Sequence, residues 1–237
     1  MRRLRFPLLW IIGVAAVLLS ACSGSPTPTP GPSRSPTPAP TPSPTPIPPD
    51  TMSVGLLGLG IGTFDLAAFP VASLKNDARY HGAASVVVHF VTHRDGRTLG
   101  SLDSAAVNLA PGETLAVSAD CTDACDGATS VVATIAVGSW STTIGPIFTT
   151  EPAAYSCNPC HSANGYGNVT GTLTPSSTVA SGEAVAGFAV CENKAGAILG
   201  GGYEEFIWQA APSLSATVPV VINAAPSSCA LGASTGW

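Results

Sequence analysis

Residues 23–49 consist almost entirely of Pro, Thr and Ser, arranged in Thr-Pro and Ser-Pro repeats. A segment with so few apolar side chains cannot bury enough surface to form a packed core. Alternating prolines favour the polyproline II conformation, at about 3.1 Å per residue, so the tract could reach on the order of 80 Å. We therefore expect a disordered spacer here, and any folded part must come from residues 51–237.

The residues before this tract have the pattern of an export signal. The cationic start Met1-Arg2-Arg3-Leu4-Arg5 is followed by an apolar run over residues 6–19. That run is shorter than the roughly 20 residues that span a hydrocarbon core, and the small residues Ser20 and Ala21 follow it. The pattern predicts a cleaved signal peptide over residues 1–21. The alternative is a membrane helix that is not cleaved.

The four residues Leu19-Ser20-Ala21-Cys22 resemble the lipobox of bacterial lipoproteins. The resemblance implies a diacylglyceryl group on Cys22 and cleavage just before it. Residues 22–50 would then be the lipidated cysteine and its linker, with the lipid bilayer as the first partner. We expect an extracytoplasmic protein that is lipid-anchored to the cell membrane.

Charge narrows the range of other partners. Without residues 1–21 the chain keeps six Lys/Arg against 14 Asp/Glu, a formal net charge of −8. A surface of this sign does not attract phosphate backbones, so nucleic-acid binding is excluded.

The remainder of the chain is rich in Gly, Ala, Thr and Val and poor in strong helix formers, which favours strands over helices. Short strand-like runs recur between turn signals, at residues 53–57, 85–92, 115–118, 130–137, 184–191 and 217–222. The pattern predicts an all-β fold of one or two small immunoglobulin-like β-sandwich domains. Alternation within residues 86–92 places Val86, Val88 and Phe90 on one face, which we expect to be the core face.

An internal repeat suggests two related domains. Residues 92–100 are echoed 100 positions later, at residues 192–200, and both copies follow a strand-like run. A Pro-containing segment comes next in each copy, then another strand-like run, then Cys125 or Cys229. We predict one β-sandwich domain over residues 51–150 and a second over residues 151–237. Chance similarity between apolar strands is the alternative.

The order of strand, charged turn, strand, Leu-Ala-Pro-Gly-Glu-Thr and strand resembles the FxLyD-type immunoglobulin-like modules of bacterial lipoproteins. The resemblance covers about residues 70–137 and 168–229, with residues 169–173 as the opening strand of the second module. The sequence departs from the pattern at Val117, where an aromatic residue is usual, and at Ser213, which replaces the turn glycine. The family implies a β-sandwich displayed outside the membrane, and it implies no catalytic residues.

Six cysteines remain besides Cys22, an even number that predicts three disulfides in an exported chain. They are Cys121, Cys125, Cys157, Cys160, Cys191 and Cys229. Six cysteines allow 15 pairings. Proximity favours Cys121 with Cys125 and Cys157 with Cys160, which leaves Cys191 for Cys229. The last pair closes the longest loop and should stabilise the fold most, by roughly 3–4 kcal/mol in the chain-entropy model.

The segment Cys157-Asn158-Pro159-Cys160-His161 also matches the pattern for covalent attachment of haem c. The two thiols would bond to the haem and His161 would bind its iron. Met52 is the only methionine after residue 21, and no helical pattern surrounds the motif. A structural disulfide is therefore the preferred interpretation, with haem as the main alternative and a zinc site or redox pair as lesser ones.

The other polar residues give no site. His89 and His93 are about 13 Å apart along one strand, too far to share a metal, and the acidic residues Asp120, Asp123 and Asp126 lack the spacing of a calcium loop. No catalytic motif is recognisable, so we expect a non-enzymatic envelope protein without a cofactor. It would display its domains for binding or for structural or adhesive contact with an extracytoplasmic protein or the cell wall. The alternative is an electron-transfer lipoprotein with one haem c.

Overall fold

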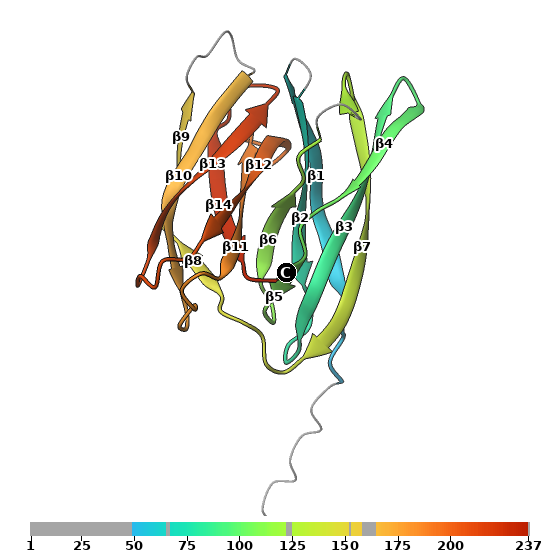
Figure 1. The fold of residues 1–237 in the computed structure, drawn as a ribbon. Coiled ribbons are helices and arrows are strands. Elements are labelled where there is room, and N and C mark those ends of the chain that lie inside the picture. The colour runs from blue at the N-terminus through green and yellow to red at the C-terminus, as the bar shows by residue number, and fades with distance from the viewer. Residues whose placement is uncertain (1–48, 65–66, 122–124, 152, 158–164, 237) are drawn as a thin grey trace, which may run out of the picture. The chain divides into compact units, whose positions relative to one another are not determined.

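Every named element of the computed structural model is a β-strand, which confirms the all-β fold class (Figure 1). The structure describes residues 49–64, 67–121, 125–151, 153–157 and 165–236. Within these ranges no helix has the length and apolar character needed to cross a membrane. Cys22 and residues 1–48 lie outside the described residues, so the signal peptide, the lipid attachment and the spacer stay predictions.

Two antiparallel sheets form the first half of the fold. The strands are β1 (Val54–Phe64), β2 (Ala67–Asn76), β3 (Gly82–Arg94), β4 (Arg97–Asp103), β5 (Val107–Leu109), β6 (Thr114–Ser118) and β7 (Ser130–Ser141). One sheet has the order β1-β2-β6. In the other, β3 is central, with β4 and β5 along one edge and β7 along the other. The two sheets pack face to face as a β-sandwich.

Alternation along β3 supplies the core of this sandwich. Val86, Val88 and Phe90 are fully buried, as expected from the sequence, whereas His89 between them is exposed. Leu74 of β2 and Val117 of β6 belong to the same apolar cluster. Burying side chains of this size stabilises the fold by about 1.5–3 kcal/mol each.

The second half of the fold forms a single sheet, in which the first three strands pair at one end. Its strands are β8 (Phe148–Thr150), β9 (Ala154–Cys157), β10 (Gly165–Pro175), β11 (Ala184–Glu192), β12 (Ile198–Ile207), β13 (Leu214–Ile222) and β14 (Ser228–Ser234). The strand order is β14-β11-β12-β13-β10-β8, with β9 also paired to β10. Strands β12 and β13 pair only through Gly200 and Gly201. The sheet folds over at this corner and encloses a second core, in which Trp208 is fully buried.

The sequence repeat corresponds to two hairpins of the same kind. Residues 92–100 span the turn between β3 and β4, and residues 192–200 span the turn between β11 and β12. Gly96 and Gly196 hold equivalent left-handed positions, with φ of 77° and 78°. The strand pairing is also repeated, since β2–β6 and β3–β7 correspond to β10–β13 and β11–β14. Both halves therefore share one connectivity, and their independent folding stays a prediction.

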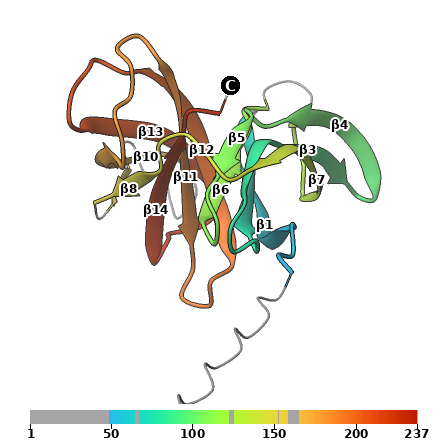
Figure 2. The same ribbon diagram turned by 90° about the horizontal axis from the view of Figure 1, so that it is seen from below.

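Glycines allow the two halves to pack closely. Along β1, Gly60 and Gly62 face β12 and β13, where a Cβ on Gly60 would lie 2.7 Å from Ile198 and one on Gly62 would collide with the backbone of Val221. On the facing strand a Cβ on Gly201 would lie 2.8 Å from Val71. We call these three residues the glycine seam. Because Phe188 of β11 joins the first apolar cluster, the described residues form one compact unit (Figure 2).

Candidate functional site

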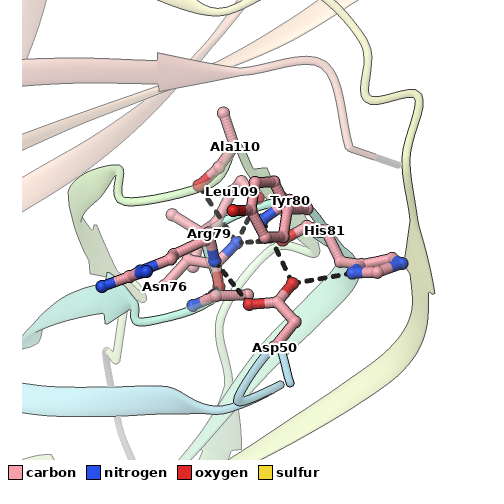
Figure 3. Close-up of polar contacts among 8 residues, drawn as sticks. Asp50, Asn76, Arg79, Tyr80, His81, Leu109 and Ala110 are labelled. Carbon is pink, nitrogen blue, oxygen red and sulfur yellow. Dashed lines mark hydrogen bonds and ion pairs between the residues drawn. The ribbon is translucent and has the colours of Figure 1, made fainter. Parts of the chain in front are cut away.

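Asp50, the second described residue, binds the turn between β2 and β3 (Figure 3). Its carboxylate accepts hydrogen bonds from the backbone N–H groups of Arg79 at 2.7 Å and Tyr80 at 3.1 Å. The third partner is Nδ1 of His81, 2.7 Å from the same carboxylate. We call these four residues the Asp50 clamp. It fixes the point at which the chain enters the folded unit.

Asn76 holds the other side of this turn and is fully buried at the end of β2. Its side-chain Nδ2 donates to the carbonyl oxygens of His81 at 2.9 Å, Leu109 at 3.1 Å and Ala110 at 3.0 Å. Its Oδ1 accepts from the N–H of Ala78 at 3.0 Å. One amide thus connects the β2–β3 turn to the segment that leads into β6.

Hydrogen bonds and burial shift the pKa values of the two carboxyl groups in this region. The bond from His81, and then the backbone N–H of Arg79, lower the pKa of Asp50 to about 2, so Asp50 is ionised and Nδ1 of His81 carries the shared hydrogen. Glu113 accepts a bond of 2.6 Å from the N–H of Ala110. Burial nevertheless raises the pKa of Glu113 above its usual value.

This arrangement anchors the start of the folded unit. Both oxygens of the Asp50 carboxylate and both polar atoms of the Asn76 side chain have hydrogen-bond partners within the protein. The described residues contain no group of three or more His, Cys, Asp or Glu side chains that could hold a metal. Buried polar groups with all partners satisfied make a unique and rigid local structure.

Two predicted disulfides are confirmed. Cys121 and Cys125 are bonded with their Cα atoms 5.6 Å apart, and Cys191 and Cys229 are bonded with their Cα atoms 4.1 Å apart. Cys191 of β11 and Cys229 of β14 stand directly opposite each other, so this disulfide ties two paired strands of the second core. It closes a loop with a sequence separation of 38 residues.

Cys157 is the last residue of β9 and is also disulfide-bonded. Cys160 and His161 lie outside the described residues, so the pairing with Cys160 and the haem alternative both stay predictions. The side chain of Tyr155 packs against the second core, and Tyr166 forms an edge-on ring contact with Phe64, with centroids 5.2 Å apart.

The histidines lie in different places on the surface. His89 forms a cross-strand pair with Asp103, 2.7 Å from Nδ1 to the carboxylate, and both side chains are exposed. His93 stands 3.5 Å from the hydroxyl of Thr98. Exposed pairs of this kind contribute little to stability. Among the tryptophans, Trp208 is a core anchor, Trp140 is half-buried, and Trp237 lies outside the described residues.

Sequence reasoning did not identify the Asp50 clamp. The available signal was the position of Asp50 directly after Pro48 and Pro49, as the first charged residue beyond the spacer. Asn76 at the end of an apolar run was a second signal. The partners of both residues depend on the tertiary fold, because Asp50 meets residues 29 to 31 positions away.

Comparison with protein-family models, curated proteins and solved structures found no match.

Proposed function

We propose that this protein is a non-enzymatic envelope lipoprotein, anchored through acylated Cys22, that displays its β-sandwich unit for binding or adhesive contact outside the membrane. The observation that carries the proposal is the junction at Asp50. The Pro/Thr/Ser-rich residues 23–49 are followed directly by Asp50, whose carboxylate accepts three hydrogen bonds from the folded unit.

Three further features support this proposal. The resemblance of residues 19–22 to a lipobox predicts the anchor. Disulfides such as those at Cys121–Cys125 and Cys191–Cys229 persist in oxidising compartments outside the cytoplasm. The glycine seam joins the two halves closely, so the unit presents its surfaces in one fixed arrangement. The resemblance to FxLyD-type modules is consistent with the same role.

The anchor is tested by comparing the wild-type chain with Cys22→Ala in the native host. We expect the wild-type protein to partition into the detergent phase and to carry a lipid mass on Cys22. The variant should be released or should accumulate as an uncleaved precursor. Cys125→Ala is the matched control, because it also removes a cysteine but should leave the detergent partitioning unchanged. Normal cleavage of Cys22→Ala with unchanged partitioning would contradict the proposal.

A further inference from the structure

Strand β11 contributes to both cores of the fold. Val185, Ala189 and Cys191 belong to the second core, whereas Ala186 and Phe188 belong to the first apolar cluster. All five side chains are fully buried. A strand with one face in water alternates apolar and polar residues, and β11 lacks this alternation because both of its faces are covered. Without the first half of the fold, the face of β11 that carries Phe188 would be exposed to water.

A side chain of the second half holds the free edge of β1. Ile61 stands opposite Pro70 of β2, which has no N–H group, so the backbone groups of Ile61 and Thr63 point away from β2. Asn223, which directly follows β13, binds both residues. Its Oδ1 accepts from the N–H of Thr63 at 2.8 Å and from the Thr63 hydroxyl at 3.2 Å, and its Nδ2 donates to the carbonyl oxygen of Ile61 at 2.6 Å. The amide of Asn223 therefore takes the place of a peptide group of a neighbouring strand.

A second contact of this kind joins β14 to β5. Ser234, the last residue of β14, is buried, and its hydroxyl oxygen accepts a hydrogen bond of 2.9 Å from the N–H of Asn108. The chain stays close to β5 after this point, since a Cβ on Gly236 would lie 2.7 Å from the backbone of Val107. We call Asn223 and Ser234 the polar clasps. Each joins a side chain of the second half to backbone groups of a strand in the first half.

We propose that the two halves form a single cooperative folding unit, in which the polar clasps and the shared strand β11 make each half depend on the other. Separation would leave the buried side chain of Phe188 exposed and would break the hydrogen bonds of both clasps. It would also uncover the backbone along the glycine seam. Independent folding of residues 51–150 and 151–237 is the alternative. This inference goes beyond the proposed function, which does not depend on how the halves unfold.

Hydrogen exchange of the full-length protein in detergent and mild urea, measured segment by segment by mass spectrometry, tests the coupling. The perturbation is Leu173→Ala, because Leu173 is fully buried in the second core, whose buried residues all come from the second half. Loss of a buried leucine should speed exchange through global opening by about 30-fold or more. We expect β3, in the first half, to accelerate by the same factor as β13. The milder Leu173→Val should accelerate both strands equally by a smaller factor, and it serves if the alanine variant does not fold.

The clasp is tested by Asn223→Ala, measured without urea. The segment that contains Thr63 should exchange about tenfold faster, because the N–H of Thr63 loses its acceptor. Asn193→Ala is the matched control, since its side chain also accepts two hydrogen bonds from backbone N–H groups, but both lie within its own turn. It should leave the exchange of the Thr63 segment unchanged.

The outcomes separate the two models of folding. Faster exchange of β13 in the Leu173 variants with unchanged exchange of β3 would show that the halves unfold separately, and it would overturn the proposal. Exchange of the Thr63 segment at the wild-type rate in Asn223→Ala would reject the clasp at Asn223. None of these results bears on lipid attachment, which the Cys22 experiment tests separately.

Discussion

Replacing Asn76 by alanine should destabilise the folded unit more than any other change to a single polar side chain described above. The variant loses the bond from the N–H of Ala78 and the contacts of Nδ2, whose two hydrogens serve the carbonyl oxygens of His81, Leu109 and Ala110. Each bond contributes about 1 kcal/mol net, and buried carbonyl groups left without a donor cost more. We therefore expect a loss of about 4 kcal/mol in the free energy of unfolding. For a domain of this size that lowers the melting temperature by roughly 10 °C.

The measurement is urea unfolding of the full-length protein followed by tryptophan fluorescence, since Trp208 is buried in the second core and Trp140 is half-buried in the first. Asn193→Ala is the matched control, because Asn193 accepts two backbone hydrogen bonds in an exposed turn. It should cost about 1 kcal/mol or less. Asn76→Asp keeps the shape of the side chain but removes the donors, so it should be as damaging as alanine. A loss below about 1 kcal/mol for Asn76→Ala would refute the role of Asn76 as the link between the β2–β3 turn and the segment that leads into β6.

Two other predictions concern the clamp and the cysteine motif. The folded-state pKa of Asp50 is about 2, below its ordinary value of 3.8, so its contribution to stability is present above pH 3.8 and is lost as the pH falls towards 2. Urea unfolding between pH 5 and pH 2 should therefore show a smaller acid-induced loss of stability for Asp50→Asn than for the wild-type protein. Equal losses in both proteins would contradict the clamp. Intact mass of the protein from its native envelope should match three disulfides and no haem; a haem-stained band that survives denaturation would instead favour the electron-transfer alternative.

Local patterns in the sequence were sufficient to locate many of the strands. Alternating or continuous β-branched runs identified β3, β6, β7, β11 and β13 within a few residues, because their apolar faces are buried in the two cores. Strand β2 was missed. It contains Pro70, and proline normally argues against a central strand. The structure accommodates it because Pro70 lies just beyond Val71, the last residue of β2 that pairs with β6.

Features that depend on distant segments could not be predicted. The glycines of β1 form no side-chain pattern from which a packing partner could be predicted. The requirement for glycine becomes apparent only in the structure, where β12 and β13 approach β1 closely. The hydrogen bonds of Asn76 to Leu109 and Ala110 join residues 33 and 34 positions apart. The repeated hairpins, in contrast, were detectable because the residues that form each turn are adjacent in the sequence.

The Asp50 clamp also determines how the folded unit would carry a mechanical load. A pull on the chain that precedes Asp50 first meets three hydrogen bonds to the β2–β3 turn, before it reaches β1. Beyond them, β1 is paired with β2 from Val54 to Phe64, with one register shift between Leu56 and Gly58, and these hydrogen bonds lie perpendicular to the strands. A force along the strand direction therefore acts on them in shear, so that many must break together. The point of attachment is thus among the most force-resistant parts of the fold.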